Sequence, residues 1–167
     1  MDWLAHSARA DRPAQTYGDH VLRAMDRARE IASSASQGLP HAAGFSECVR
    51  LATEFHDMGK LDDDNQAVLA SPSGKPLPRE HVDAGTKHLF GLGTPTACFA
   101  GMLAYSHHRG LPDVAEQKER GAMAWRVDES NSRFDIMEVV ERTRRLLPVY
   151  LRRHHEALDR PPSVASA

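Results

Sequence analysis

Residues 51–66, LATEFHDMGKLDDDNQ, decide the fold and the chemistry expected of this chain. The stretch begins as an apolar helical pattern and ends in an adjacent histidine and aspartate, His56 and Asp57. Gly59 and Lys60 follow at once. A helix that only has to stop needs the glycine and a basic residue near its end, but not an imidazole beside a carboxylate. Because both of these side chains ligate metal ions, the stretch predicts a packed helix with a metal site at its end.

The composition is that of one globular domain. With 167 residues, 41% hydrophobic and 26% charged, the chain is long enough to bury about two-thirds of its unfolded surface. A net charge of −2 excludes a nucleic-acid binder that works through bulk positive charge, but it allows a local basic groove. Cys48 and Cys98 have no metal-type spacing, and residues 1–13 contain no apolar run of signal-peptide or membrane length. We therefore expect a cytoplasmic protein that does not contact a membrane.

Almost every segment has a helical pattern of apolar residues. Helices are expected at residues 17–35, 45–58, 79–91, 96–109, 121–130 and 134–158, with a short one after residue 61. Asp19 is the expected N-cap of the first helix, Gly59 the C-cap of the second, and Pro148 is expected to kink or break the last. No segment alternates as a strand does. The fold class predicted is all-α, with one domain over residues 1–160 and a frayed tail at 161–167.

Ten histidines are more than a chain of this length usually carries. Several side chains able to bind metal occur at the starts or ends of the expected helices: His20, His56, Asp57, His81, His107 and His108. There they can converge on one centre. Imidazole with carboxylate suits divalent Mn, Fe, Co, Ni or Zn, and such an ion activates water and binds phosphoryl oxygens. Lys60 would add a positive charge near a phosphate.

Each histidine also has a simpler interpretation. A single buried histidine is more often a hydrogen-bonded core residue than a ligand, and an "HD" pair occurs by chance in many proteins. His154 and His155 lie among arginines and are interpreted as a solvated helix end. His6, His41 and His88 are interpreted as structural or exposed, although His88 shares a predicted helix face with His81. The ordered series His, His-Asp, His, His-His is what distinguishes a site from these cases.

The sequence HDMGK at residues 56–60 resembles the signature of the HD superfamily of metal-dependent phosphohydrolases. The fuller series is similar to the HD nuclease domain of the CRISPR-associated nuclease-helicase of type I systems. The matching pieces are LAHS at residues 4–7, YGDHVLRA around His20, HDMGKLDDDNQ from His56, EHVDAG around His81, and SHHRGLPD at residues 106–113. They run in the family's order over about the first two-thirds of the chain.

The resemblance implies an HD-domain helical bundle with a two-metal centre at converging helix ends. His56, Asp57 and a late aspartate would hold one ion with His20 near it. A second ion would be held by His81, His107 and His108, with Asp57 bridging. The nearest late aspartate is Asp128, which comes earlier than the family's; Asp135 and Asp159 are weaker candidates. Asn65 stands where the family often has an aromatic residue, which predicts altered packing under the site.

The implied reaction is cleavage of single-stranded DNA in CRISPR interference, with two divalent ions among Mn, Ni, Co, Fe and Mg. Asp57 and Lys60 would be the catalytic residues, and Lys60, Lys87 and Arg109 would contact phosphate. The implied partners are a helicase and an RNA-guided surveillance complex. The chain carries no helicase motif, since SPSGKPLP at residues 71–78 lacks the features of a phosphate loop. We expect the helicase to be a separate polypeptide, or this chain to be a fragment.

Two other functions fit part of the pattern. One is an HD phosphohydrolase acting on nucleotides or cyclic nucleotides, and the other is a degenerate HD domain kept as a docking module. The arginine-rich residues 141–155, with Tyr150 among them, would either follow a DNA strand and stack a base or form a solvated amphipathic helix.

Overall fold

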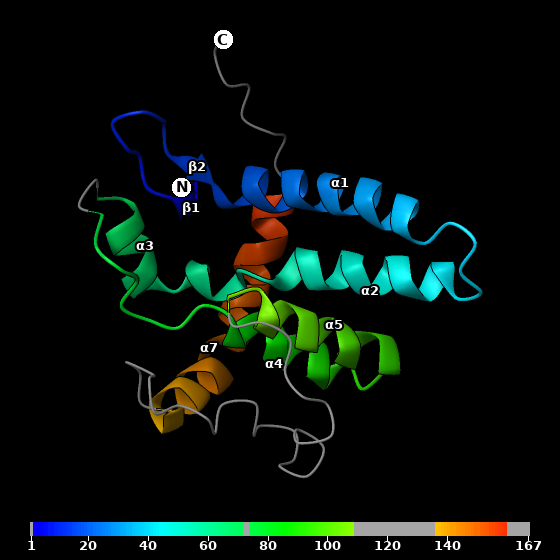
Figure 1. Cartoon of the computed structure of the whole chain (residues 1–167). Coiled ribbons are helices and arrows are strands. Elements are labelled where there is room, and N and C mark those ends of the chain that lie inside the picture. Colours follow the sequence, from blue (N-terminus) through cyan, green and yellow to red (C-terminus); the bar gives the residue numbers. More distant parts are fainter. Residues whose placement is uncertain (1, 72–73, 109–135, 160–167) are drawn as a thin grey trace.

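The computed structural model describes residues 2–71, 74–108 and 136–159. The elements follow in the order β1 (Leu4–His6), β2 (Gln15–Thr16), α1 (Tyr17–Ala35), α2 (Ala42–Phe55), the 3-10 helix η1 (Met58–Leu61), α3 (Asp63–Leu69), α4 (Asp83–Gly91), α5 (Pro95–Ser106) and α7 (Ile136–Leu158) (Figure 1). The all-α fold class is confirmed, because helices make up nearly all of this order. The expected helix at residues 121–130 lies outside the described residues.

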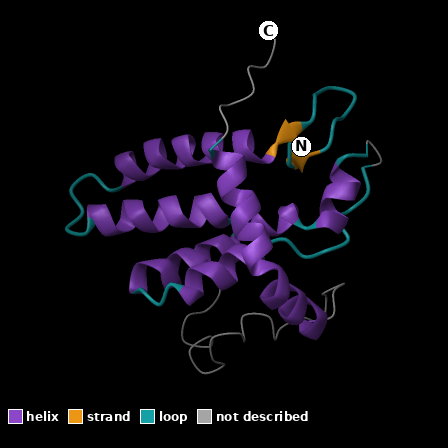
Figure 2. Ribbon diagram, turned by 180° about the vertical axis from the view of Figure 1, so that it is seen from behind, coloured by secondary structure: helices purple, strands orange, loops and turns teal. Residues whose placement is uncertain are grey.

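The helices stack in a bundle that one long helix crosses. In Figure 1, α1, α2 and the α4–α5 pair lie one below the other, and α2 contacts both α1 and α5. The view from behind shows α7 running across this stack (Figure 2), where it contacts α1, α4 and η1. The crossing helix therefore ties the first part of the chain to the turn that follows α2.

The hydrophobic core fills the space where α7 crosses the other helices. Its largest fully buried apolar side chains are Tyr17, Met58, Leu61, Leu89 and Val21. On α5 the buried residues of this core are small, Ala100 and Ala104, which lets α5 pack closely on its neighbours. Two core residues, Met58 and Leu61, belong to η1. The turn that carries Lys60 is therefore held by the core itself.

The ends of the first two helices differ from the predictions. Thr16, not Asp19, is the N-cap of α1, because its side chain accepts a hydrogen bond from the Asp19 amide. The second helix begins at Ala42 and ends at Phe55, so Gly59 is not its C-cap. Gly59 instead lies buried within η1, where its N–H donates to the His81 carbonyl at 3.0 Å. A contact distant in sequence, not helix termination, accounts for this glycine.

Three further local features of the structure differ, in whole or in part, from the predictions. A two-stranded antiparallel sheet, β1 with β2, stands before α1, and strands of two and three residues are too short to show alternation. α7 continues through Pro148 and is not broken there. α4 begins at Asp83, after His81, and α5 ends at Ser106, before Gly110. Among the described residues, no helix has both the length and the apolar character needed to cross a membrane.

Candidate metal centre

The candidate ligands lie at the joints between elements, as expected from the sequence. Asp57 connects α2 to η1, and His56 is the residue after the last turn of α2. His20 lies in the first turn of α1. His81 precedes α4, while His107 and His108 follow α5. Helix ends from distant parts of the chain therefore meet around one carboxylate.

One oxygen of Asp57 faces two histidines and a lysine. Asp57 Oδ2 is 3.0 Å from His20 Nε2 and 3.2 Å from His56 Nε2. The two imidazole nitrogens are 3.1 Å apart. Lys60 Nζ is 2.7 Å from the same oxygen. These three residues, His20, His56 and Asp57, form a first group that offers ligand atoms to a metal ion.

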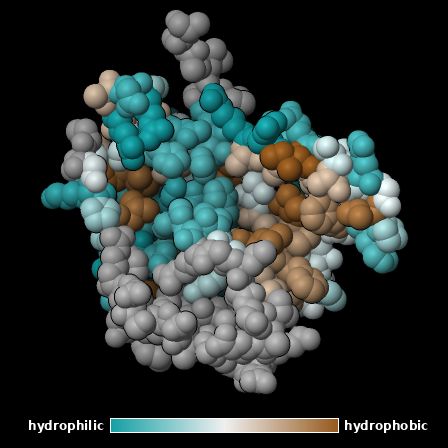
Figure 3. Space-filling view, in the orientation of Figure 1, coloured by the Kyte–Doolittle hydropathy of each residue, from teal (hydrophilic) through white to brown (hydrophobic). Residues whose placement is uncertain are grey.

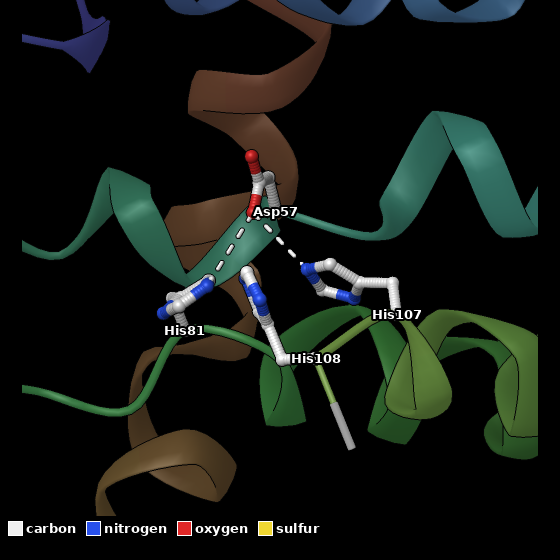
Figure 4. A group of neighbouring side chains, drawn as sticks. All are labelled: Asp57, His81, His107 and His108. Carbon is white, nitrogen blue, oxygen red and sulfur yellow. Dashed lines mark ion pairs between the residues drawn. The ribbon is translucent and has the colours of Figure 1, made fainter. Parts of the chain in front are cut away.

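The other oxygen of Asp57 faces a second group. Asp57 Oδ1 is 3.6 Å from His81 Nε2 and 3.6 Å from His107 Nε2. Figure 4 shows these two side chains and His108 turned toward the carboxylate from below. Within this group of four, Asp57, His81, His107 and His108, the ligand atoms all lie within 4.8 Å of one another. Asp57 is thus shared by both groups, one oxygen for each.

The geometry of the second group fits a metal ion better than a network of hydrogen bonds. Asp57 Oδ1 and His81 Nε2 are both buried, and neither has a hydrogen-bond partner among the described residues. Buried polar atoms without partners are costly, so such a pair calls for an explanation. Donor atoms around one tetrahedral ion with bonds of about 2.1 Å are roughly 3.4 Å apart, close to the 3.6 Å separations here. The residues present therefore fit a divalent ion.

Hydrogen bonds to the backbone orient two of the imidazoles. His56 Nδ1 lies 2.7 Å from the Thr53 carbonyl, and His107 Nδ1 lies 2.5 Å from the Ala104 carbonyl. A carbonyl only accepts, so Nδ1 carries the proton in both rings. When the ring is neutral, Nε2 is therefore the nitrogen that keeps the lone pair, which is the tautomer that binds a metal. In both cases the accepting carbonyl belongs to the residue three positions before the histidine, in the last turn of α2 or of α5.

The carboxylate at the centre is held ionised. Burial opposes ionisation of Asp57, but the imidazoles of His107, His20 and His56 outweigh it and hold the pKa of this carboxyl well below its usual range. Burial lowers the pKa of the His81 imidazole to about 4. Burial opposes the charge of His56 as well, but Asp57 outweighs it and raises the pKa of that imidazole. The ionised Asp57 and the neutral His81 imidazole are in the protonation states in which these groups bind a metal.

Two residues let the His81 segment reach Asp57. A Cβ on Gly59 would lie 2.6 Å from the His81 Cα and carbonyl oxygen, so only glycine permits this approach. Asn65 is fully buried and donates to the Gly59 carbonyl at 3.0 Å, while its own oxygen accepts from the Arg79 amide at 2.9 Å. Asn65 thus joins η1 to the segment that carries His81. An aromatic side chain, which the family often has at this position, could not form these two hydrogen bonds.

The remaining predicted site residues either lie outside the described residues or belong to neither of the two groups around Asp57. Asp128, Arg109 and Asp135 lie outside the described residues. Lys87 lies on α4, half-buried, and no hydrogen bond or ion pair among the described residues joins it to Asp57. Asp159 is exposed after α7 and belongs to neither group.

Two interpretations of histidines are corrected by the packing. His154 is not solvated: it is fully buried, with Nδ1 3.0 Å from the Tyr17 hydroxyl, whereas His155 is exposed. His88 does not share a helix face with His81, which precedes α4; its ring lies 4.5 Å from that of Phe55.

Tyr150 and two arginines of the arginine-rich residues 141–155 contact other parts of the fold. The Tyr150 hydroxyl donates to Asp62, and the ring is buried, so it offers no face for a base. Arg142 donates to Asp62 and Asp64, and Arg153 pairs with Asp63. These side chains dock α7 onto the turn after Asp57. The sequence predicted a helix here but gave no sign of these ion pairs, of which only the Asp62 carboxylate is buried.

Sequence analysis missed His6 as a neighbour of the site. β1 brings its ring to 4.9 Å from the ring of His20 in an edge-to-face arrangement. Burial is the main cause that lowers the pKa of His6 to about 4, with the charges of Lys60, His20 and Arg12 acting in the same direction. The LAHS motif was the only signal that pointed to it.

Comparison with known proteins gives one partial similarity. A stretch of 47 residues, 28% of this chain, is 36% identical to the CRISPR-associated endonuclease Cas3-HD of Thermoproteus tenax. The matched stretch covers 21% of that protein, so the chain matches about a fifth of the relative's length. No family model matches the chain, and no solved structure does. The chain therefore has a local likeness to an HD-type endonuclease and a histidine–aspartate cluster that offers the ligands for a metal ion.

Proposed function

We propose that this chain is a metal-dependent HD-type nuclease that hydrolyses phosphodiester bonds of single-stranded DNA in CRISPR interference. It would act with a helicase, on another chain or on a missing part of this one, and with an RNA-guided surveillance complex. The observation that carries the proposal is the sharing of Asp57 between two histidine groups, one on each carboxylate oxygen. The partial similarity to the Cas3-HD endonuclease adds support.

Two ions would be held by the two groups. The first site would use His20, His56, Asp57 and a late aspartate, for which Asp128 is the candidate. The second would use His81, His107, His108 and the other oxygen of Asp57. Bound divalent ions supply a water of lowered pKa and neutralise the non-bridging oxygens of the scissile phosphate.

The protein's own residues then have separate tasks. The Asp57 carboxylate fixes the spacing of the two groups because its two oxygens face opposite sets of imidazoles. The Lys60 ammonium is 2.7 Å from Asp57 and is held in η1 by the core, so it provides a fixed positive charge for the phosphate. Lys87 and Arg109 are proposed as further phosphate contacts.

The second group is accessible to a polymer substrate. His107 and His108 are exposed, whereas Asp57 behind them is almost fully buried. Figure 3 shows hydrophilic side chains over the middle of the face viewed in Figure 1, and hydrophobic ones over the far ends of the stacked helices. An extended strand can approach such a centre from the side of the two adjacent histidines.

Cleavage by metal-stripped protein tests this proposal. Mn, Ni, Co, Mg and Zn are added back in turn to the full chain with a single-stranded DNA, and Asp57→Ala serves as the inactive control. We expect cutting that depends on the metal and is lost in Asp57→Ala. Metal binding without cutting, together with turnover of nucleotides or cyclic nucleotides, would replace the nuclease by a nucleotide phosphohydrolase. Absence of metal binding would leave a docking module.

A further inference from the structure

The β1–β2 hairpin stands next to the candidate metal centre, and arginines occupy its tip. β1 ends at His6, whose ring touches that of His20. Beyond it, Arg9 and Arg12 exchange two backbone hydrogen bonds, of 2.9 and 3.3 Å, and close the tip as an antiparallel pair. Both arginines are exposed. The hairpin forms the loop at the upper left of Figure 1, beside the start of α1.

The base of this hairpin is fixed to the turn that carries the site. The Gln66 side chain accepts from the Leu4 amide and donates to the Leu4 carbonyl, both at 2.8 Å, as a neighbouring strand would. The same amide group donates to the Lys60 carbonyl at 2.7 Å. The Tyr17 amide donates to Trp3 at 2.7 Å. The hairpin is therefore held in a set position relative to Lys60 and Asp57.

The two arginines at the tip are unlike most arginines of the described residues. Arg50, Arg79, Arg142 and Arg153, for example, all pair with carboxylates of this chain. No ion pair is formed by Arg9 or Arg12 with any residue in the described part of the chain. Their guanidinium groups remain available to an external anion.

The placement of these arginines costs stability. Residues that pair across an antiparallel bridge present their side chains on one face, about 5 Å apart, and like charges in that position repel. A local arrangement that opposes folding, with no compensating ion pair among residues 2–71, 74–108 and 136–159, is typical of a functional position. Two guanidinium groups on one face can bind two successive phosphates, since each forms forked hydrogen bonds with phosphate oxygens.

We propose that residues 7–14 form a substrate-binding arm, in which Arg9 and Arg12 bind backbone phosphates of the single strand beside the scissile linkage. This inference rests on the proposed nuclease function. The arm would hold the strand by its backbone without reading its sequence, because phosphate contacts position a nucleic acid and carry no base information. The strand would then pass from the hairpin tip, past His6, to the exposed His107 and His108.

Binding of single-stranded DNA at varied salt tests the arm separately from catalysis. Anisotropy of a fluorescein-labelled oligothymidylate is measured with the full chain in EDTA, which prevents cutting. The arm variant is Arg9→Ala with Arg12→Ala. The control is Arg27→Ala with Arg29→Ala, which removes the same charge from two exposed positions of α1. Each lost phosphate contact reduces the magnitude of the slope of log affinity against log salt by about 0.7. The arm variant loses two contacts, so its slope should fall in magnitude by about 1.4, and the slope of the control should hardly change.

Hydrolysis of bis(p-nitrophenyl) phosphate with added Mn gives a second readout. This small diester has no phosphate besides the one that is cleaved, so nothing in it can bind the two arginines as a flanking phosphate would. The arm variant should therefore hydrolyse it at the rate of the unchanged chain. An unchanged salt slope in the arm variant, or no binding of the strand by the unchanged chain, overturns the arm. If the unchanged chain cuts no substrate, but the arm variant loses the expected value of about 1.4 in the slope of log affinity against log salt, the proposed nuclease function is overturned. The proposed binding role of the arm then stands.

Discussion

Among individual side chains, the hydrogen-bond partner of Nδ1 distinguishes a candidate metal-binding histidine from a core histidine. In His56 and His107, Nδ1 donates to a backbone carbonyl, so Nε2 is the nitrogen that faces Asp57 and can bind a metal. In His154 the ring stacks on Phe55 at 4.7 Å, and Nδ1 meets the Tyr17 hydroxyl inside the core. The first arrangement prepares a metal site, and the second stabilises the docking of α7.

Replacing Lys60 separates its charge from the metal ligands. We expect Lys60→Met to retain bound metal, because none of the candidate ligand atoms is removed. Cleavage should fall about a hundredfold, since one fixed positive charge near the developing negative charge is lost. The rate of single-strand cleavage and the metal content by mass spectrometry check this. Lys75→Met, in the exposed loop before α4, is the control, and equal rates for both variants would refute the role of Lys60.

The adjacent histidines of α7 form a matched pair for a stability test. His154→Ala should cost about 3 kcal/mol, because it leaves a cavity beside Phe55 and removes the partner of the buried Tyr17 hydroxyl. His155→Ala, at an exposed position, should stay within about 0.5 kcal/mol. Urea unfolding of both variants gives the free energies. Similar losses in the two would show that His154 is not part of the core.

Among the secondary-structure elements, the joint between η1 and the segment before α4 determines whether the site can form. Gly59 allows that approach, and Asn65 bridges its two sides. Gly85 on α4 makes a similarly close contact, since a Cβ there would lie 1.8 Å from the Phe55 carbonyl. The backbone of α4 therefore packs directly against the end of α2, next to His56.

Gly59→Ala is expected to damage the site through the backbone. Its Cβ would meet the His81 backbone at 2.6 Å, which a rotamer change cannot relieve, so we expect a loss of about 2 kcal/mol and weaker metal binding. Gly44→Ala, in α2 with nothing within 4 Å of the added atom, should gain roughly 0.5 kcal/mol and keep metal affinity. Calorimetric titration with Mn and urea unfolding test both. Unchanged metal affinity in Gly59→Ala would contradict this role.

The sequence predicted the elements better than their contacts. The helical period of residues 17–35 predicted α1, although not its N-cap. The spacing of His56, Asp57 and Lys60 pointed to the turn that carries the centre. The role of Gly59 could not be foreseen, because it depends on a segment more than twenty residues away. Burial of His154 likewise depends on how α7 crosses α1, which no local pattern contains. Asp128 stays a prediction.

In the whole molecule, α7 is joined to the site-bearing turn by a buried carboxylate network. Arg142 and the Tyr150 hydroxyl both donate to Asp62, a residue only 1% exposed. Burial opposes the charge of Asp62, but Arg142 and Tyr150 outweigh it and hold the pKa of this carboxyl below its usual range. Arg142 thus pairs with a buried carboxylate that would destabilise the fold if it were left without a partner.

This network predicts a dependence of stability on pH. The folded chain holds the pKa of Asp62 below the unfolded value, so the stabilisation is present above about pH 4 and is lost as pH falls further. Arg142→Met should therefore cost about 3 kcal/mol at neutral pH and less in acid. Urea unfolding of both proteins across the acid range checks this. A cost that does not change with pH would show that the ion pair does not stabilise the fold.

The metal content of purified protein tests the central claim, that Asp57 joins two histidine groups into one metal centre. The chain and two variants, Asp57→Ala and the exposed Asp26→Ala, are stripped, incubated with Mn, freed of excess by gel filtration and analysed by mass spectrometry for metal per chain. We predict two ions in the unchanged chain and in Asp26→Ala, and loss of both in Asp57→Ala. Equal metal in Asp57→Ala, or none in the unchanged chain, would contradict the claim.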